Sequence, residues 1–197
     1  MDTQELLEKN RYFNVDYDWW EDEYSLFMDK MEERGITILS PKDICFSGFC
    51  SQGDGASFTG YIHRTDLSRF IELHKLSEGY AATYYLAKLE EIDIKLVRRH
   101  SMYCHSNTVV LDIEDMGTSA LEERGKDDFR QVIQATMFTQ YLKELNSFEE
   151  EVINICRSYM DQLYDQLERQ YNYLTSDEAI LESLEMNNLY IPRKLTA

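Results

Sequence analysis

Residues 91–115 read EIDIKLVRRHSMYCHSNTVVLDIED, and this stretch decides the fold. Apolar residues alternate with other residues over 91–98 and again over 108–115, which is the two-residue period of a β-strand. Ser106 and Asn107 lie between the two runs and are turn-forming residues. The stretch therefore predicts an antiparallel β-hairpin.

A second hairpin is predicted upstream, over residues 44–62. Residues 44–50 are rich in β-forming residues, and residues 56–62 alternate small or polar residues with apolar ones, mostly aromatic. Residues 51–55 form a loop between them. Two hairpins supply four strands, which we expect to form one antiparallel four-stranded sheet packed with helices. The predicted fold class is α+β.

Helical periodicity surrounds the strands. An aromatic stripe with three- and four-residue steps predicts a helix over 16–34, which Gly35 ends. Shorter helices are predicted over 65–76 and 78–90, and a last one over 176–188.

The pattern is also helical from residue 126 onward. Ser147 followed by Glu150 has the form of a capping box, so we expect Asn146 and Ser147 to separate two long C-terminal helices. Residues 1–125 would then form a sheet region, and residues 126–197 a helical region that packs on it within one compact domain.

The composition indicates a folded, reduced protein of the cytoplasm. Of its 197 residues, 43% are apolar and 13% aromatic, which is enough to build a core. No run approaches the roughly 18 apolar residues of a membrane helix, and the amino terminus MDTQELLEKNR has no secretion-signal pattern. Four irregularly spaced cysteines indicate free thiols rather than a disulfide framework.

The formal net charge of −17 restricts the class of partner. Both ends of the chain are strongly acidic, whereas residues 61–110 are nearly neutral. Such a field repels nucleic acid and anionic membranes and attracts basic protein surfaces. We therefore expect a basic protein partner and no direct nucleic-acid or membrane binding.

The candidate partner-binding residues combine tryptophans with clustered acids. A partly exposed tryptophan beside acids suits a hot spot against a basic surface, whereas the alternative places both rings in a broad aromatic core. The candidates are Trp19, Trp20, Glu21, Asp22, Glu23, Asp112, Glu114, Asp115, Glu149, Glu150 and Glu151.

The glycine-rich loop has two interpretations. Ser51, Gln52, Gly53, Asp54 and Gly55 satisfy the needs of a tight hairpin turn. The same residues could instead bind a ligand, with Gln52 and Asp54 as polar groups and the glycines presenting backbone amides. The loop matches neither a Walker loop nor the dinucleotide fingerprint.

No metal, cofactor or catalytic residue is predicted. Cys45, Cys50, Cys104 and the neighbouring histidines do not have a recognised zinc-ligand spacing. Serine and cysteine nucleophiles are present, but the sequence shows no histidine and carboxylate relay to activate one. We therefore do not expect an enzyme.

Three blocks of the chain resemble a group of small acidic bacteriophage and prophage accessory proteins of mostly unassigned function. The blocks are residues 15–21 (VDYDWWE), residues 46–60 (FSGFCSQGDGASFTG) and residues 171–180 (YNYLTSDEAI). The resemblance implies a protein made in the bacterial host cytoplasm, of a class that often blocks host nucleases or other defence machinery.

Three functions remain open at this point. The first is an interaction protein that inhibits a host defence or nucleic-acid-binding protein, in part by nucleic-acid mimicry. The second is a small-ligand-binding protein or enzyme that uses the glycine-rich loop, residues 47–58. The third is a structural or assembly protein that forms a homodimer through its C-terminal helices.

Overall fold

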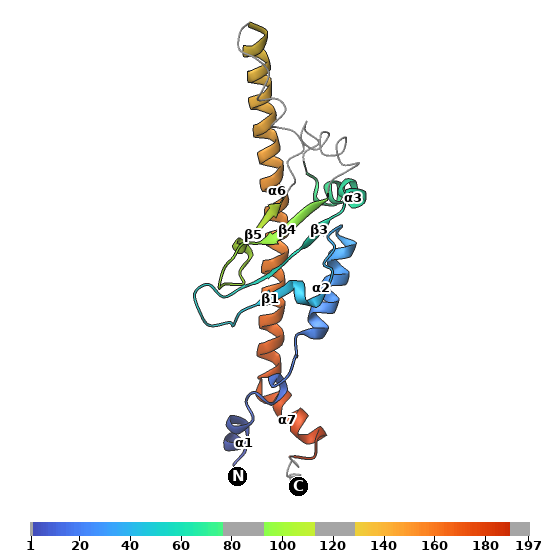
Figure 1. Cartoon of the computed structure of the whole chain (residues 1–197). Helices are drawn as coiled ribbons and strands as arrows, with labels where there is room; N and C mark the ends of the chain where they lie inside the picture. Colours follow the sequence, from blue (N-terminus) through green and yellow to red (C-terminus); the bar gives the residue numbers. More distant parts are fainter. Residues whose placement is uncertain (1, 77–92, 113–128, 190–197) are drawn as a thin grey trace.

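The computed structural model describes residues 2–76, 93–112 and 129–189 (Figure 1). The helix predicted over 78–90 and the candidate residues Glu114 and Asp115 lie outside the described residues. Within them, the protein combines helices with small antiparallel sheets, so the predicted α+β class is confirmed.

The elements follow one another along the chain with short connections in the first half. The α-helices are α1 (Thr3–Lys9), α2 (Glu21–Glu33), α3 (Arg64–His74), α6 (Phe129–Leu174) and α7 (Asp177–Met186). The strands are β1 (Ile44–Phe46), β2 (Ala56–Phe58), β3 (Gly60–Ile62), β4 (Ile94–Arg98) and β5 (Val109–Asp112). The described residues also contain three short 3₁₀ helices: η1 (Phe13–Val15), η2 (Pro41–Asp43) and η3 (Ser106–Thr108).

The hairpin predicted over 91–115 forms, the hairpin predicted over 44–62 forms only between residues 44–46 and 56–58, and the prediction of one four-stranded sheet is wrong. β1 pairs with β2 in a two-stranded sheet, and β3, β4 and β5 form a separate three-stranded sheet. The chain passes from one sheet to the other at Thr59 and Gly60. A side chain at Gly60 would meet the Thr37 carbonyl oxygen at 2.3 Å, so glycine is required where Tyr61 bridges to Thr37.

The C-terminal half contains one long helix where two were predicted. α6 runs without interruption through Asn146 and Ser147 for 46 residues, which corresponds to about 70 Å. The capping-box pattern is overridden because residues 129–174 contain neither glycine nor proline, and both polar side chains lie exposed on the helix surface. Figure 1 shows this helix as the axis of the molecule, with both sheets beside it.

The helix predicted over 16–34 begins later than expected. α2 starts at Glu21, and residues 16–20, between η1 and α2, form bends and a turn rather than helix. The predicted end is confirmed, since Gly35 follows the helix with a positive φ of 80° that favours glycine. Trp19 and Trp20 therefore precede α2 rather than lying along one of its faces.

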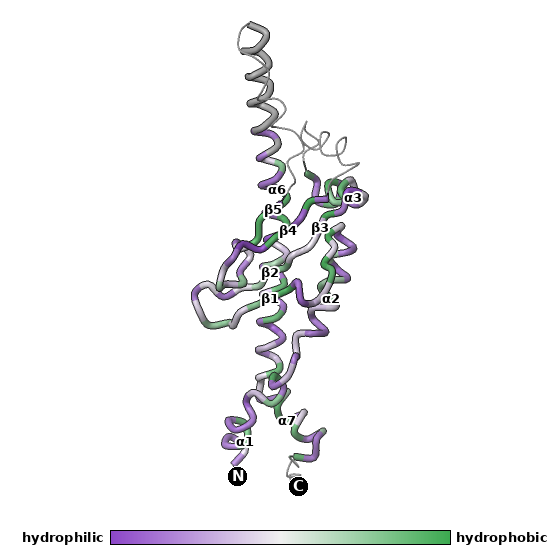
Figure 2. The backbone as a smooth tube through the Cα atoms, in the orientation of Figure 1, coloured by the Kyte–Doolittle hydropathy of each residue, from purple (hydrophilic) through white to green (hydrophobic). Residues whose placement is uncertain are grey.

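The main hydrophobic core lies between α6, the strands and the helices α2 and α3. Phe27, Phe58 and Phe70 are almost completely buried in it, and α6 contributes a fully buried row at three- and four-residue steps that includes Val152, Leu163 and Leu167. In Figure 2, apolar and polar residues alternate along the coloured part of α6, as expected for a helix that buries one face.

A second, smaller core joins α1 to α7. Leu6 and Leu7 pack there against Ile180 and Leu184. The predicted last helix is thereby confirmed, and Ser176 caps it by accepting a hydrogen bond from the amide of Ala179. None of the described helices is long and apolar enough to cross a membrane.

Candidate functional site

The segment of residues 12–22, here called the acidic aromatic segment, includes η1 and runs into the first turn of α2, in the lower part of the molecule in Figure 1. Polar contacts to the junction of α6 and α7 fix its beginning. The Arg11 guanidinium donates to the carbonyl of Thr175 at 3.0 Å and to the carboxylate of Asp177 at 2.7 Å. The buried Asn14 side chain donates to two carbonyls of the same junction, at 3.1 and 3.2 Å. The segment is thus attached to the C-terminal end of the long helix.

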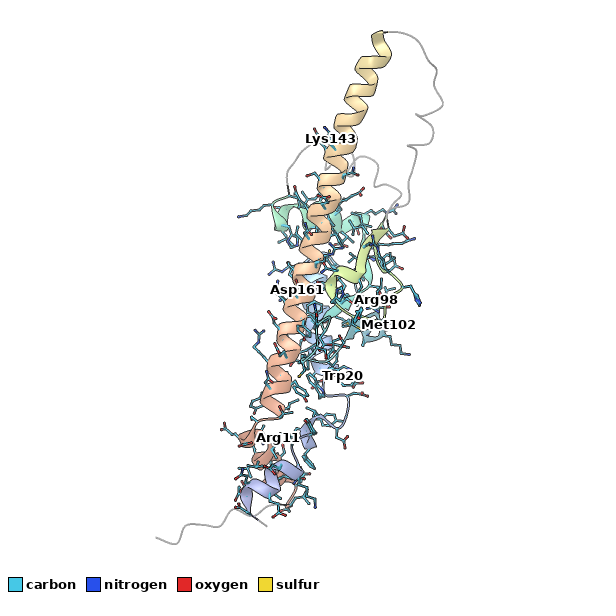
Figure 3. All side chains as sticks on the ribbon, turned by 90° about the vertical axis from the view of Figure 1, so that its left-hand side faces the viewer. Arg11, Trp20, Arg98, Met102, Lys143 and Asp161 are labelled. Atoms are coloured by element: carbon cyan, nitrogen blue, oxygen red, sulfur yellow. The ribbon has the colours of Figure 1, made fainter. Side chains whose placement is uncertain are left out.

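The two tryptophans occupy different environments at the end of this segment. Trp19 is only 8% exposed and packs against Phe46, Phe49 and Tyr171. Trp20 is half-buried, and its ring meets those of Trp19 and Phe46 edge to face at 5.9 and 5.5 Å. Trp19 is therefore a core residue, whereas Trp20 presents part of a firmly held ring to solvent (Figure 3).

Exposed aromatic rings and carboxylates share the rest of the segment. Tyr12 is 62% exposed and Tyr17 64% exposed. The carboxylates beside them are also exposed: Asp16, Asp18, Glu21 and Asp22. Among the described residues, none of these four carboxylates has a hydrogen-bond or ion-pair partner. Glu21 and Asp22 lie in the first turn of α2, where the helix dipole stabilises negative charge.

The predicted acidic candidates do not form one surface. Glu23 is half-buried and accepts a hydrogen bond from the Gln166 side chain. Glu149, Glu150 and Glu151 lie on the same helix as Gln166 but more than four turns away, at roughly 25 Å for Glu149. Of these three, Glu150 is exposed and the other two are half-buried. Asp112, at the end of β5, is exposed.

The glycine-rich loop is an ordered turn. One carboxylate oxygen of Asp54 accepts hydrogen bonds from the amides of Cys50 and Ser51 at 3.0 and 2.6 Å. Gly53 has a positive φ of 96°, and the hydroxyl of Tyr164 on α6 donates to the Gly48 carbonyl at 2.9 Å. The structural interpretation of Asp54 is therefore supported. Ser51 and Gln52 remain exposed at the tip of the loop.

A cavity of about 630 Å³ opens beside this loop. Its walls come from three parts of the chain: Gly53 and Asp54 of the loop, residues 105–107 before β5, and Asn154, Arg157, Ser158 and Asp161 on one face of α6. Of the sequence-predicted loop candidates, Gly53 and Asp54 line the cavity. His105 and Arg157 were not predicted as site residues, because no local pattern connects them to the loop.

The cysteines are free thiols in the structure. Cys45 lies within 3.6 Å of the Ser57 hydroxyl, and the thiols of Cys104 and Cys45 interact. Burial, and then this contact, raise the pKa of the Cys104 thiol to about 11. Over the described part of the chain, no group of three histidine, cysteine or acidic side chains is arranged to hold a metal ion.

Comparison with known proteins identifies a family but no characterised relative. Residues 19–177 match the family described as a domain of unknown function, DUF8835. That range includes both tryptophans, the glycine-rich loop and every residue that lines the cavity. No curated protein and no solved structure matches the chain. Because the family match covers most of its length, the chain belongs to the DUF8835 family.

Proposed function

We propose that this protein is an interaction protein that binds a basic protein partner through the acidic aromatic segment. One observation carries the proposal: exposed aromatic rings and carboxylates without partners among the described residues lie together on a segment that is fixed to the protein. We assign the function to this segment rather than to Glu149–Glu151, because no aromatic ring among the side chains that the structure describes is exposed beside those three acids.

The aromatic side chains would supply most of the affinity. Tyrosine and tryptophan are the residue types that most often act as binding hot spots, because each buries a large surface while few bonds lose rotational freedom. Tyr12 and Tyr17 are free to be covered by a partner, and the Trp20 ring is already held by its neighbours. A pre-organised ring reduces the entropy lost on binding.

The carboxylates would supply the attraction and the specificity. Asp16, Asp18, Glu21 and Asp22 add a local negative field to that of a chain with a net charge of −17. Such a field accelerates encounters with a basic surface and discriminates against acidic proteins. Since a basic surface of this kind is typical of nucleic-acid-binding proteins, we propose a partner of that class.

The biological setting that we propose rests on the resemblance to bacteriophage accessory proteins. In that setting the partner is a host nuclease or defence protein, and the binding is inhibitory because the acidic segment occupies the surface that would hold nucleic acid. The cytoplasm of the bacterial host is the corresponding location.

The test begins with capture of a partner from bacterial lysate by the tagged protein, followed by affinity measurements with the purified partner. Tyr17→Ala removes an exposed ring from the segment, and Met102→Ala is the matched control because Met102 is 93% exposed on a different loop (Figure 3). We expect Tyr17→Ala to weaken binding about tenfold or more, and Met102→Ala to leave it unchanged.

Two results would overturn the proposal. One is a captured partner that is not basic and that stays bound equally well at high salt. The other is an affinity that Tyr17→Ala and Trp20→Ala leave at the wild-type value while both variants remain folded.

A further inference from the structure

The cavity between the glycine-rich loop, residues 105–107 and α6 has walls of a single chemical character. Every residue that lines it is polar, charged or glycine. Asn154, Arg157, Ser158 and Asp161 project from consecutive turns of α6, because positions three, four and seven residues apart share one helix face. The lining therefore favours a polar ligand over an apolar one.

The walls of the cavity are held in place before any ligand binds. Asp54 is fixed by the two amide hydrogen bonds within its own loop. His105 is packed so closely against the loop that a side chain at Gly55 would meet its Cβ at 2.6 Å. The Thr108 hydroxyl donates to the His105 carbonyl at 2.8 Å, which secures the second wall. Such pre-organisation favours binding of a small molecule.

The positive side of the cavity is the guanidinium of Arg157. One terminal nitrogen donates to the Val109 carbonyl at 3.0 Å, which anchors the side chain. Its Nε atom and the Nδ1 atom of His105 are buried and lack a hydrogen-bond partner among the described residues. Two buried polar groups, one on α6 and one in residues 105–107, thus lack a hydrogen-bond partner among the described residues, which is uncommon in folded proteins.

The negative side consists of two carboxylates. The second oxygen of Asp54 makes no hydrogen bond with the described residues, since both amides of the loop bind the other oxygen. Asp161 is exposed, and no described basic side chain lies within ion-pair distance of it, although Arg157 is one helical turn away. Figure 3 labels Asp161 midway along α6.

We propose that this cavity binds a small zwitterion of the amino-acid class, with its carboxylate at Arg157 and its ammonium group at Asp54 and Asp161. A simple anion would meet two carboxylates, and a simple cation would meet the guanidinium. A ligand with both charges satisfies both sides, and Ser158, Asn107 and Asn154 provide neutral hydrogen-bonding groups around it.

The experiment is a titration of the isotope-labelled full chain, followed by amide NMR spectra, with the common free amino acids as probes. Acetate and methylammonium serve as single-charge probes. We expect at least one amino acid to shift the amide signals of residues 53–55, 105–107 and 154–161 in a saturable manner. Each single-charge probe should bind roughly tenfold or more weakly, because it loses one charge-assisted contact.

Variants of residues that line the cavity test whether the amino acid binds there. Asp161→Asn removes one proposed carboxylate, and Asp165→Asn is the matched control, since Asp165 is exposed one turn further along α6 and does not line the cavity. Asp161→Asn should weaken amino-acid binding roughly tenfold while Asp165→Asn leaves it unchanged. Arg157→Gln should abolish binding, and Arg157→Lys should restore part of it.

Three results would overturn the inference: no saturable shift with any amino acid, equal binding of acetate or methylammonium, or equal effects of Asp161→Asn and Asp165→Asn. The proposal is independent of the partner-binding function, because the acidic aromatic segment does not line the cavity. Asp161→Asn should therefore leave partner affinity at the wild-type value, so that either proposal can fail alone.

Discussion

The acidic aromatic segment and the cavity differ in how the chain builds them. The segment is a continuous run of residues 12–22, whereas the cavity joins three parts of the chain that lie as far apart as Gly53 and Asp161. The segment is attached beside the small core of α1 and α7, and the cavity lies on the main core around α6. A local surface can thus be read from a sequence, but an assembled one depends on packing.

The largest expected effect is a loss of stability, and it tests whether the two cores unfold separately. Phe58 is fully buried in the main core, so Phe58→Ala should lower the free energy of unfolding by about 3–5 kcal/mol. Leu184→Ala, in the small core, should instead loosen α1 and α7 while the main unfolding transition keeps its urea midpoint. Urea denaturation and hydrogen exchange measure both quantities. An equal shift of the main transition by both variants would contradict the separation.

A smaller effect tests the contact between the glycine-rich loop and the second cavity wall. Gly55→Ala would place a Cβ at 2.6 Å from that of His105 and 2.7 Å from its Cα, so it should destabilise the protein by about 1–3 kcal/mol. Gly48→Ala is the control in the same loop, because its nearest neighbour would lie at 3.6 Å. Thermal unfolding of the two variants gives the comparison, and equal melting temperatures would show that the loop does not press on His105.

A comparable loss of stability is expected at Asn14, which attaches the acidic aromatic segment to the junction of α6 and α7. Asn14→Ala leaves the Leu174 and Ala179 carbonyls without their side-chain donor, which should cost about 1–3 kcal/mol of local stability. Faster amide exchange in residues 12–18, with unchanged exchange in β4 and β5, would confirm a local release. Asn10→Ala is the control, since among the described residues the Asn10 side chain donates to the Leu6 carbonyl at the end of the same helix and to no other group.

The smallest expected effect concerns the thiol of Cys104. Burial, then the contact with Cys45, raise its pKa to about 11 from a reference value of 9.0. The unfolded chain therefore loses this proton at lower pH than the folded chain does, and stability falls as pH rises between those two values.

The variant Cys104→Ser isolates this contribution, because other buried thiols and tyrosines are present in both proteins. We expect the urea midpoint of wild type to fall more than that of the variant when the pH is raised from about 8 to about 10. A difference independent of pH would show that the thiol ionises equally in both states.

Local patterns predicted the elements well and their assembly less well. The pairing of β4 with β5 followed from alternation, and the end of α2 followed from Gly35, since both depend on neighbours in the sequence. The split into two sheets falls at Thr59 and Gly60, where Gly60 lies close to Thr37, and no periodicity of the sequence indicates that contact. The continuity of α6 could have been inferred from the absence of glycine and proline between residues 129 and 174.

The candidate residues show the same distinction. Trp20 and the acids at the start of α2 were predicted because they are neighbours in the chain. Tyr12 and Tyr17 were missed as site residues, although their proximity to Asp16 and Asp18 was a readable signal. His105 and Arg157 could not be predicted, because only the packing of η3 against α6 brings them to the loop.

The association rate of the purified protein with its captured partner tests the central claim most directly. The variant to compare with wild type replaces Asp16, Asp18, Glu21 and Asp22 by lysine. Its control replaces Asp29, Glu32, Glu33 and Glu72 by lysine as well. These four acids are exposed and lie outside the segment, so both variants change the net charge by the same amount. We predict that the first variant slows association roughly tenfold or more at low salt and removes most of its salt dependence, while the control retains most of both. Equal rates for the two variants would contradict the assignment of partner binding to residues 12–22.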